Sequence, residues 1–228
     1  MINARSIINK VEEIQIYAYD NEPDIICVTE SWAHEGIDDA ELSIEGYKIL
    51  RNDRTHSKGG GCLVYFKSEL QVTQLEQYTN TSLTETIWCR ATTRSGKVIL
   101  GICYHSTSAS KESEQKLHQL IAQVCNTHDD VVIVGDFNHS SIDWVNLTAG
   151  VEGKCFLELT QDLFLIQNIL ESTRGNNILD LVLSSNPDMV SNVGVGEPFS
   201  DHKIVTFDII VAVDCLNSTL LKELAEDI

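Results

Sequence analysis

Residues 131–144 read VVIVGDFNHSSIDW. The first four residues are β-branched and apolar, which is typical of a strand that is buried on both faces. Gly135 follows this strand, and Asp136 and Asn138 place polar side chains where it ends. An Asp-x-Asn pair after a glycine is also common in turns. The stretch therefore predicts a buried strand that ends either in an ordinary turn or in the floor of an active site.

The chain has 228 residues, of which 43% are hydrophobic and 22% are charged. This composition is typical of a globular protein, and we expect a single domain over residues 1–228 because there is no repeat or linker-like stretch. No apolar run is long enough to span a bilayer, so we expect no membrane partner. The formal net charge of −18 argues against tight non-specific binding to nucleic acid, although a site where metal ions neutralise carboxylates stays possible.

The seven cysteines form no CxxC pair, and several lie in apolar, strand-like runs. The N-terminal sequence MINARSIINK has no charged stretch followed by an apolar core, as a secretory signal would. Buried, reduced thiols are therefore expected, in a protein of the nucleus or cytoplasm that is not secreted.

The hydrophobic pattern predicts helices separated by runs of several strands. Expected helices cover residues 7–18, 111–125 with Ser110 as N-cap, and 156–163; expected strands cover 24–30, 61–67, 86–92, 98–104, 131–136, 178–185 and 203–213. The glycines at 59–61 come before a strand, which favours a hairpin turn over a phosphate-binding loop. This order predicts an α/β protein with two mixed, mostly antiparallel sheets packed face to face and helices outside.

Polar groups recur at the ends of these strands. Glu30 ends one strand, and Asp180 lies inside the apolar run ILDLVLSS, where an unpaired carboxylate would be costly. Asp201 and His202 come just before the last strand. Each of these residues has an ordinary structural explanation, such as a solvated strand end or an arginine partner. Together they predict an oxygen-rich site suited to Mg²⁺, with a histidine that can transfer protons near neutral pH.

The motifs PDIICVTES, GGGCLVYF, GICY, VGDFN, NNILDLVLSS and SDH follow one another in this order, after NARS near the start. In this order they resemble the endonuclease/exonuclease/phosphatase superfamily. The phrases NARSIINK, GDFNHSSIDW and STRGNNILDLVLSSNPD more closely resemble the apurinic-endonuclease-like domain of non-LTR (LINE-type) retrotransposons. The resemblance extends from Asn3 to about Phe207.

The resemblance implies a four-layer α/β sandwich that hydrolyses phosphodiesters of DNA with Mg²⁺ or Mn²⁺. It also implies a monomer, with a reverse transcriptase domain in a longer parent polypeptide. The implied metal-binding residues are Glu30, Asn3 beside it, and Asp201. The implied catalytic residues are Tyr104 on the scissile phosphate, Asp136 on the attacking water, Asn138 on the phosphate or water, Asp180 in support of the histidine, and His202 on a phosphate oxygen or in proton transfer.

The chain departs from the family in two places. Family members often carry Arg-x-Pro after the tyrosine, whereas Tyr104 is followed by His105. Because histidine is mostly neutral at pH 7, we expect weaker phosphate binding, with His105 as the remaining phosphate-binding group there. Only Met1 and Ile2 precede Asn3, so the family's first strand is expected to be missing and Asn3 to be poorly anchored.

Three functional hypotheses stay open at this stage. The first is a divalent-metal-dependent DNA endonuclease that nicks one strand for reverse transcription. The second is a phosphomonoesterase or small phosphodiesterase of the same fold. The third is a catalytically decayed domain that serves as a binding module.

Overall fold

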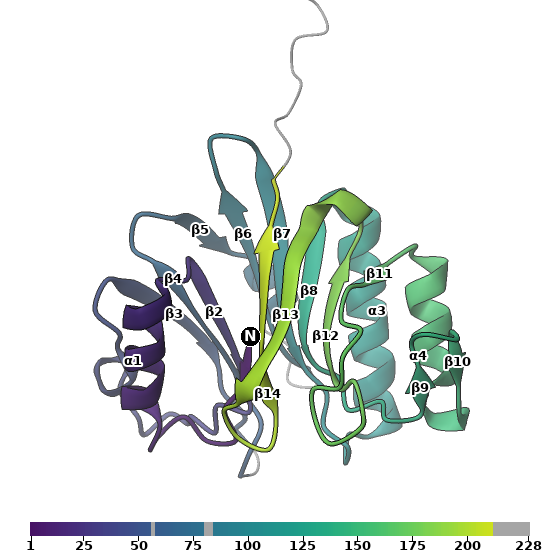
Figure 1. The fold of residues 1–228 in the computed structure, drawn as a ribbon, viewed down its shortest axis with the longest axis horizontal. Helices are drawn as coiled ribbons and strands as arrows, with labels where there is room; N and C mark the ends of the chain where they lie inside the picture. Colours follow the sequence, from purple (N-terminus) through teal and green to yellow (C-terminus); the bar gives the residue numbers. More distant parts are fainter. Residues whose placement is uncertain (56–57, 80–83, 212–228) are drawn as a thin grey trace, which may run out of the picture.

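The computed structural model describes residues 1–55, 58–79 and 84–211, which form a layered α/β structure (Figure 1). One sheet has the strand order β1 (Ile2–Asn3), β2 (Ile25–Thr29), β4 (Cys62–Lys67) and β3 (Tyr47–Asn52). The larger sheet has the order β11 (Ile166–Gln167), β12 (Asp180–Ser184), β8 (Val131–Asp136), β7 (Lys97–Tyr104), β6 (Glu85–Thr92) and β5 (Gln71–Gln74). Two ribbons complete the strands, β9 (Ile142–Asp143) with β10 (Thr148–Ala149), and β13 (Val190–Pro198) with β14 (Lys203–Ile209).

The helices lie on the outer faces of the two sheets (Figure 1). Helix α1 (Val11–Asn21) covers the smaller sheet, and α3 (Lys111–Thr127) and α4 (Val151–Asp162) cover the larger one. The short α2 (Glu76–Thr79) and the 3₁₀ turns Asp39–Leu42 and Pro187–Met189 lie in connections. Most strand pairs are antiparallel, with parallel pairing of β1 to β2 and of β7 to β8. The predicted four-layer sandwich with mostly antiparallel sheets is confirmed.

Strand β8 shows how the sequence produces these layers. Val132 and Val134 pack in the core between the two sheets, and Val131 and Ile133 pack in the core under the helices. Successive side chains of a strand point to opposite faces, so a strand covered on both sides needs apolar residues at every position. This requirement explains the uninterrupted VVIV run, which ends where the site begins.

The predicted strands match observed strands, although the last one ends earlier, at Ile209, and the helices predicted over 7–18 and 156–163 begin at Val11 and Val151. Ser110 caps α3 by accepting a hydrogen bond from Ser113 N–H at 3.1 Å. The three glycines at 59–61 lie in the connection between the antiparallel strands β3 and β4, as a hairpin requires. Cys27, Cys62, Cys89 and Cys103 are buried and free as expected, whereas Cys125 is partly exposed and Cys155 is exposed. The predicted last strand extends to residue 213, and its positions after 211 lie outside the described residues. None of the helices in the described part of the chain is long and apolar enough to cross a bilayer.

Gly135 allows β7 and β8 to approach each other at the end of the sheet that carries Asp136. A Cβ atom at this position would lie 1.7 Å from the carbonyl oxygen of Cys103, which is the paired residue on β7. The backbone atoms of both strands are held by the hydrogen bonds between them, so moving them apart would break these bonds. Only glycine fits at this position.

Replacing Gly135 with alanine should therefore lower the free energy of unfolding by roughly 3 kcal/mol, because the added methyl group forces the two strands apart. Urea denaturation followed by circular dichroism measures the change. Gly196→Ala is the matched control, since a Cβ there would lie an ordinary 3.7 Å from the carbonyl oxygen of Ile204. Equal stability of the two variants would contradict the close approach.

Candidate active site

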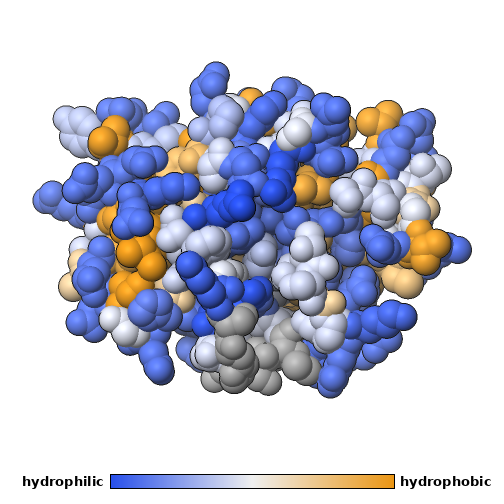
Figure 2. Space-filling model, turned by 90° about the horizontal axis from the view of Figure 1, so that it is seen from below, coloured by the Kyte–Doolittle hydropathy of each residue, from blue (hydrophilic) through white to orange (hydrophobic). Residues whose placement is uncertain are grey.

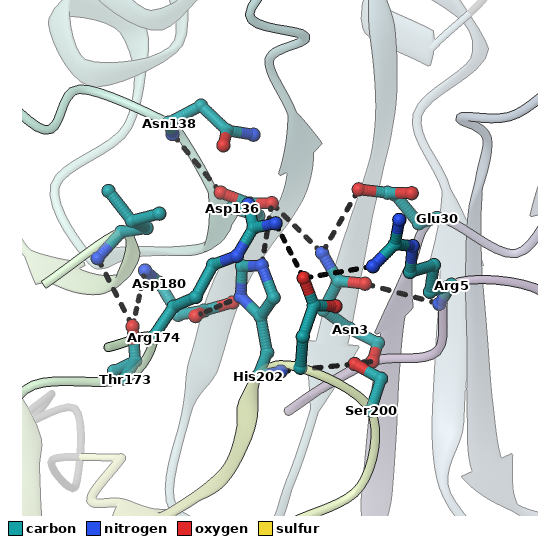
Figure 3. Close-up of polar contacts among 12 residues, drawn as sticks. Asn3, Arg5, Glu30, Asp136, Asn138, Thr173, Arg174, Asp180, Ser200 and His202 are labelled. Carbon is teal, nitrogen blue, oxygen red and sulfur yellow. Dashed lines mark hydrogen bonds and ion pairs between the residues drawn. The ribbon is translucent and has the colours of Figure 1, made fainter. Parts of the chain in front are cut away.

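Most of the polar residues predicted from the sequence lie close together at one end of the strands of the two sheets (Figure 3). Asp136 ends β8 and Asp180 begins the antiparallel neighbour β12, so the two residues are directly paired across the ladder. Asn3 ends β1, which runs parallel to β2, and Glu30 directly follows β2. Figure 2 looks at the molecule from this side, where hydrophilic residues occupy most of the centre of the surface.

The centre of the site is a buried triad of Asp136, Asp180 and His202, each at most 1% exposed. His202 Nδ1–H donates to Asp180 Oδ2 at 2.7 Å, and His202 Nε2 lies 3.8 Å from Asp136 Oδ2. The histidine is thus oriented by one carboxylate while its other nitrogen faces the second. Asp180 is fixed in turn through its backbone N–H, which donates to the Thr173 hydroxyl at 3.1 Å.

Asn3 links the triad to Glu30. Its Nδ2 donates to Asp136 Oδ2 at 2.9 Å and to Glu30 Oε1 at 3.4 Å, and its Oδ1 accepts from Arg5 N–H at 3.2 Å. Asn3 is 1% exposed and lies in β1 beside β2. The expectation that Asn3 is poorly anchored is therefore wrong, because its two-residue strand is held in the sheet and its side chain is fully hydrogen bonded.

The electrostatics of the triad favour a proton or a cation. Burial, together with the neighbouring charges of Asp180 and Glu30, raises the pKa of Asp136 to about 8 against the opposing effect of His202. Burial by itself lowers the pKa of His202, but the hydrogen bond to Asp180 and the charges of both aspartates outweigh it, so this pKa is raised. Ionisation of both buried carboxylates beside one histidine would leave excess negative charge, which a divalent cation would offset.

The site also has metal-ligating atoms that no hydrogen bond occupies. Asp180 Oδ1 is buried and has no hydrogen-bond partner among the described residues. One ligand atom each from Asp136, Asp180 and His202 lie within 4.8 Å of one another. Glu30 and Asp136 accept hydrogen bonds from the same Asn3 nitrogen, so their carboxylates face a common space. This is a mainly oxygen donor set, of the kind that Mg²⁺ prefers.

A cavity of about 230 Å³ opens in front of Glu30 and Asn138. Arg5 and Arg174 lie in its wall and both form ion pairs with Asp201, at 3.1 and 2.5 Å. Burial raises the pKa of Asp201, but Arg174 and Arg5 among others outweigh it, and the pKa is lowered. Asp201 was expected beside the metal; the structure places it in the cavity wall with Glu30, with its carboxylate held by two arginines.

Cationic side chains lie against two aromatic residues of the cavity wall. Tyr104 and Trp32 both line it, and Trp32 Nε1–H donates to Glu30 Oε2 at 3.1 Å. The Arg54 guanidinium lies 5.7 Å from the Tyr104 ring centroid, and Lys58 Nζ lies 5.5 Å from the Trp32 ring centroid. Two cations therefore lie against aromatic residues of the cavity wall, and one of them, Arg54, is also ion-paired with Glu85.

The loop after β8 holds Asn138 and His105 differently from each other. The Asn138 backbone N–H donates to Asp136 Oδ1 at 3.1 Å, and its side chain, part of the cavity wall, donates to the carbonyl of His105 at 3.0 Å. The His105 ring is hydrogen bonded through Nδ1 to the Phe137 carbonyl at 3.2 Å and is stacked on His139. His105, predicted as a phosphate-binding group, is thus directed under the loop and is not among the residues that line the cavity.

Backbone conformation also marks the site. Arg5, Ser6, Glu30, Trp32 and Asn138 all have positive φ, between 44° and 84°. Non-glycine residues adopt this region at a cost and persist there when surrounding contacts impose it, often at functional sites. Here the left-handed residues turn the chain after β1, β2 and β8, and all of them except Ser6 line the cavity.

Sequence reasoning missed Arg5, Trp32, Thr173, Arg174 and Ser200. Arg5 and Arg174 stand in the quoted phrases NARSIINK and STRGNNILD, yet nothing in their sequence context separates them from surface arginines. Ser200, whose hydroxyl donates to the Asn3 carbonyl at 2.8 Å, joins the two ends of the described chain at the site.

The raised pKa of Asp136 predicts how metal-free stability depends on pH. The unfolded chain ionises this carboxyl near pH 4, whereas the folded chain keeps the proton until about pH 8, so stability is present at low pH and is lost as pH rises through this window. In EDTA, the Tm of the wild type should fall by several degrees between pH 5 and pH 8 relative to Asp136→Asn, which cannot ionise. Thermal unfolding at both pH values measures this, and parallel Tm curves would contradict it.

Comparisons with known proteins give a family match over part of the chain and a shared fold. Residues 98–206 match the family described as endonuclease-reverse transcriptase, a segment that includes Tyr104, Asp136, Asn138, Asp180 and the Asp201–His202 pair. No curated protein matches the chain in sequence.

Several solved structures share the fold at low sequence identity. The endonuclease domain of TRAS1, a telomere-specific non-LTR retrotransposon, has a TM-score of 0.72 and 15% identity over 92% of this chain and 96% of that one. The AP endonuclease LMAP from Leishmania major has a TM-score of 0.72 and 14% identity over 91% and 86%. The 3′-5′ exonuclease NExo from Neisseria meningitidis has a TM-score of 0.68 and 18% identity over 91% and 97%. The chain thus has the α/β sandwich fold of the endonuclease/exonuclease/phosphatase superfamily, and its resemblance to retrotransposon endonucleases is confirmed.

Proposed function

We propose that the chain is a divalent-metal-dependent phosphodiesterase, and specifically a DNA endonuclease that nicks one strand, of the retrotransposon type. The observation that carries this proposal is the buried Asp136–His202–Asp180 arrangement, which meets Glu30 through Asn3. The match of residues 98–206 to the endonuclease-reverse transcriptase family and the fold shared with the TRAS1 endonuclease domain support the DNA substrate.

The side chains divide the work as follows. Asp136 orients the attacking water and takes its proton, since its carboxylate is held by Asn3 and by the Asn138 N–H. Asp180 fixes the Nδ1–H tautomer of His202, so that Nε2 is directed at the reacting group and can exchange a proton there. Mg²⁺ or Mn²⁺, held by Glu30 with Asn3 beside it and neighbouring carboxylates, would supply Lewis-acid stabilisation of the phosphoryl charge.

The cavity wall explains how an acidic protein could hold a phosphodiester. Arg5 and Arg174 are permanent cations in the wall, and Tyr104 and Asn138 offer hydrogen-bond donors beside them. The two arginines stand where a phosphate would need charge, although no arginine follows Tyr104 as it often does in the retrotransposon group. We infer that this pair takes over phosphate binding, and that Asp201 holds the arginines in place until the substrate binds.

Catalysis is tested by nicking of supercoiled plasmid in the presence of Mg²⁺. Asp136→Asn and His202→Asn should each lower the nicking rate about 100-fold or more, because each removes a group that moves a proton. Asp188→Asn, an exposed aspartate in the turn at the opposite end of β12, is the matched control and should nick like the wild type.

Other outcomes point to the alternatives. Release of phosphate from a 3′-phosphorylated oligonucleotide without nicking would favour the phosphomonoesterase. Tight DNA binding with no hydrolysis in Mg²⁺ or Mn²⁺ would favour a decayed binding module. Nicking by Asp136→Asn at the wild-type rate would mean that the activity comes from elsewhere.

Phosphate binding by the arginine pair is tested separately. Arg174→Ala should raise the KM for DNA about 10-fold, leave kcat less affected, and reduce the slope of log affinity against log salt by about 1, since one phosphate contact is lost. Arg94→Ala is the control because Arg94 is exposed in the β6–β7 turn, away from the site. An unchanged salt slope in Arg174→Ala would contradict a phosphate contact.

A further inference from the structure

A second group of ligating side chains lies on the helix side of the larger sheet, outside the triad. Glu114 and His118 belong to α3, and His139 belongs to the loop between β8 and β9. One ligand atom from each of the three residues lies within 4.8 Å of the others. Glu114 and His118 are four residues apart, so one turn of helix stacks them on the same face of α3.

Each histidine of this group has one ring nitrogen without a hydrogen-bond partner in the described part of the chain. The Nε2 atoms of His118 and His139 are buried without a hydrogen-bond partner among the described residues, and His139 as a whole is 8% exposed. A buried polar atom without a partner costs about 1–3 kcal/mol unless something binds it. The unpartnered nitrogens therefore point to a missing ligand that accepts lone pairs.

The rings are held in position by packing. His139 lies between His105 and Phe156, with centroid distances of 5.0 and 4.7 Å, and His118 stacks on Phe156 at 5.6 Å. His105 Nε2 is also buried without a partner among the residues described. Locked rings keep donor atoms in a fixed arrangement before a ligand arrives, which lowers the ordering cost of binding.

We propose that Glu114, His118 and His139 bind a divalent transition-metal cation of the Zn²⁺ class. Two imidazoles and one carboxylate are a common protein donor set for zinc, and three protein ligands leave one position for water. Imidazole nitrogen suits Zn²⁺, whereas Mg²⁺ prefers oxygen, so the two sites of the molecule select different cations. The bound cation would link α3 to the loop that follows Asp136 and contains Asn138, and so would hold this part of the proposed active site.

The test measures Zn²⁺ binding by equilibrium dialysis of the whole chain, with excess Mg²⁺ present to occupy the oxygen-rich site. The wild type should retain one equivalent of Zn²⁺. Glu114→Gln and His118→Asn should each weaken this binding at least about 10-fold, because each removes one ligand. Co²⁺ in place of Zn²⁺ should give the visible absorption of a low-symmetry nitrogen–oxygen site, and this absorption should be lost in both variants.

Two controls separate the proposal from its alternatives. His34→Asn removes an exposed histidine outside the group, and Glu30→Gln alters the oxygen-rich site; both should bind Zn²⁺ like the wild type. Equal Zn²⁺ binding by His118→Asn and the wild type overturns the proposal, and so does loss of binding in Glu30→Gln alone. Circular dichroism of the metal-free proteins verifies folding, and Glu114→Gln, at a partly exposed position, keeps the test valid if His118→Asn unfolds.

Discussion

Two carboxylates, Asp136 and Asp180, face each other across a pair of central strands with almost no contact with water. Like charges in a buried position repel strongly, and each would be protonated or displaced without compensating groups. The structure compensates from three directions: His202 approaches from the start of β14, Asn3 from β1, and a backbone N–H from the loop after β8. The rest of the site follows from the need to keep this pair in place.

The distribution of charge over the whole chain also contrasts with that around the cavity. The chain carries 34 acidic and 16 basic residues, yet Arg5, Arg54, Lys58 and Arg174 lie in or beside the cavity. An acidic surface repels nucleic acid everywhere except where cations gather, so weak overall attraction is compatible with a local binding site. Such a protein would depend on its active-site contacts for affinity, with little help from non-specific binding.

The sequence predicts the architecture well where local pattern decides it. The VVIV run of β8, the cap at Ser110 and the aspartate inside ILDLVLSS follow from period, capping and the cost of burying charge. Arg5 and Arg174 could not be predicted as cavity residues, because their positions depend on loops that only the tertiary structure brings beside Asp201. Strand β13 was missed because VSNVGVGEP contains glycine, asparagine and few buried residues, so its pairing with β14 overrides weak local preference. The left-handed backbone conformation of Glu30 and Asn138 likewise could not be predicted from the neighbouring residues in the sequence.

The contact between Ser200 and Asn3 joins residues 197 positions apart in the chain, and Asn3 in turn holds Asp136. Contacts at such separation form late in folding, since a long loop must close before they stabilise anything. During synthesis, the chain must therefore be translated past His202 before the carboxylate pair can be neutralised. A fragment limited to residues 98–206 would retain Asp136, Asp180 and His202 but lose Asn3 and Glu30 along with the smaller sheet. The segment that matches the family is thus shorter than the unit that brings the residues of the proposed site together.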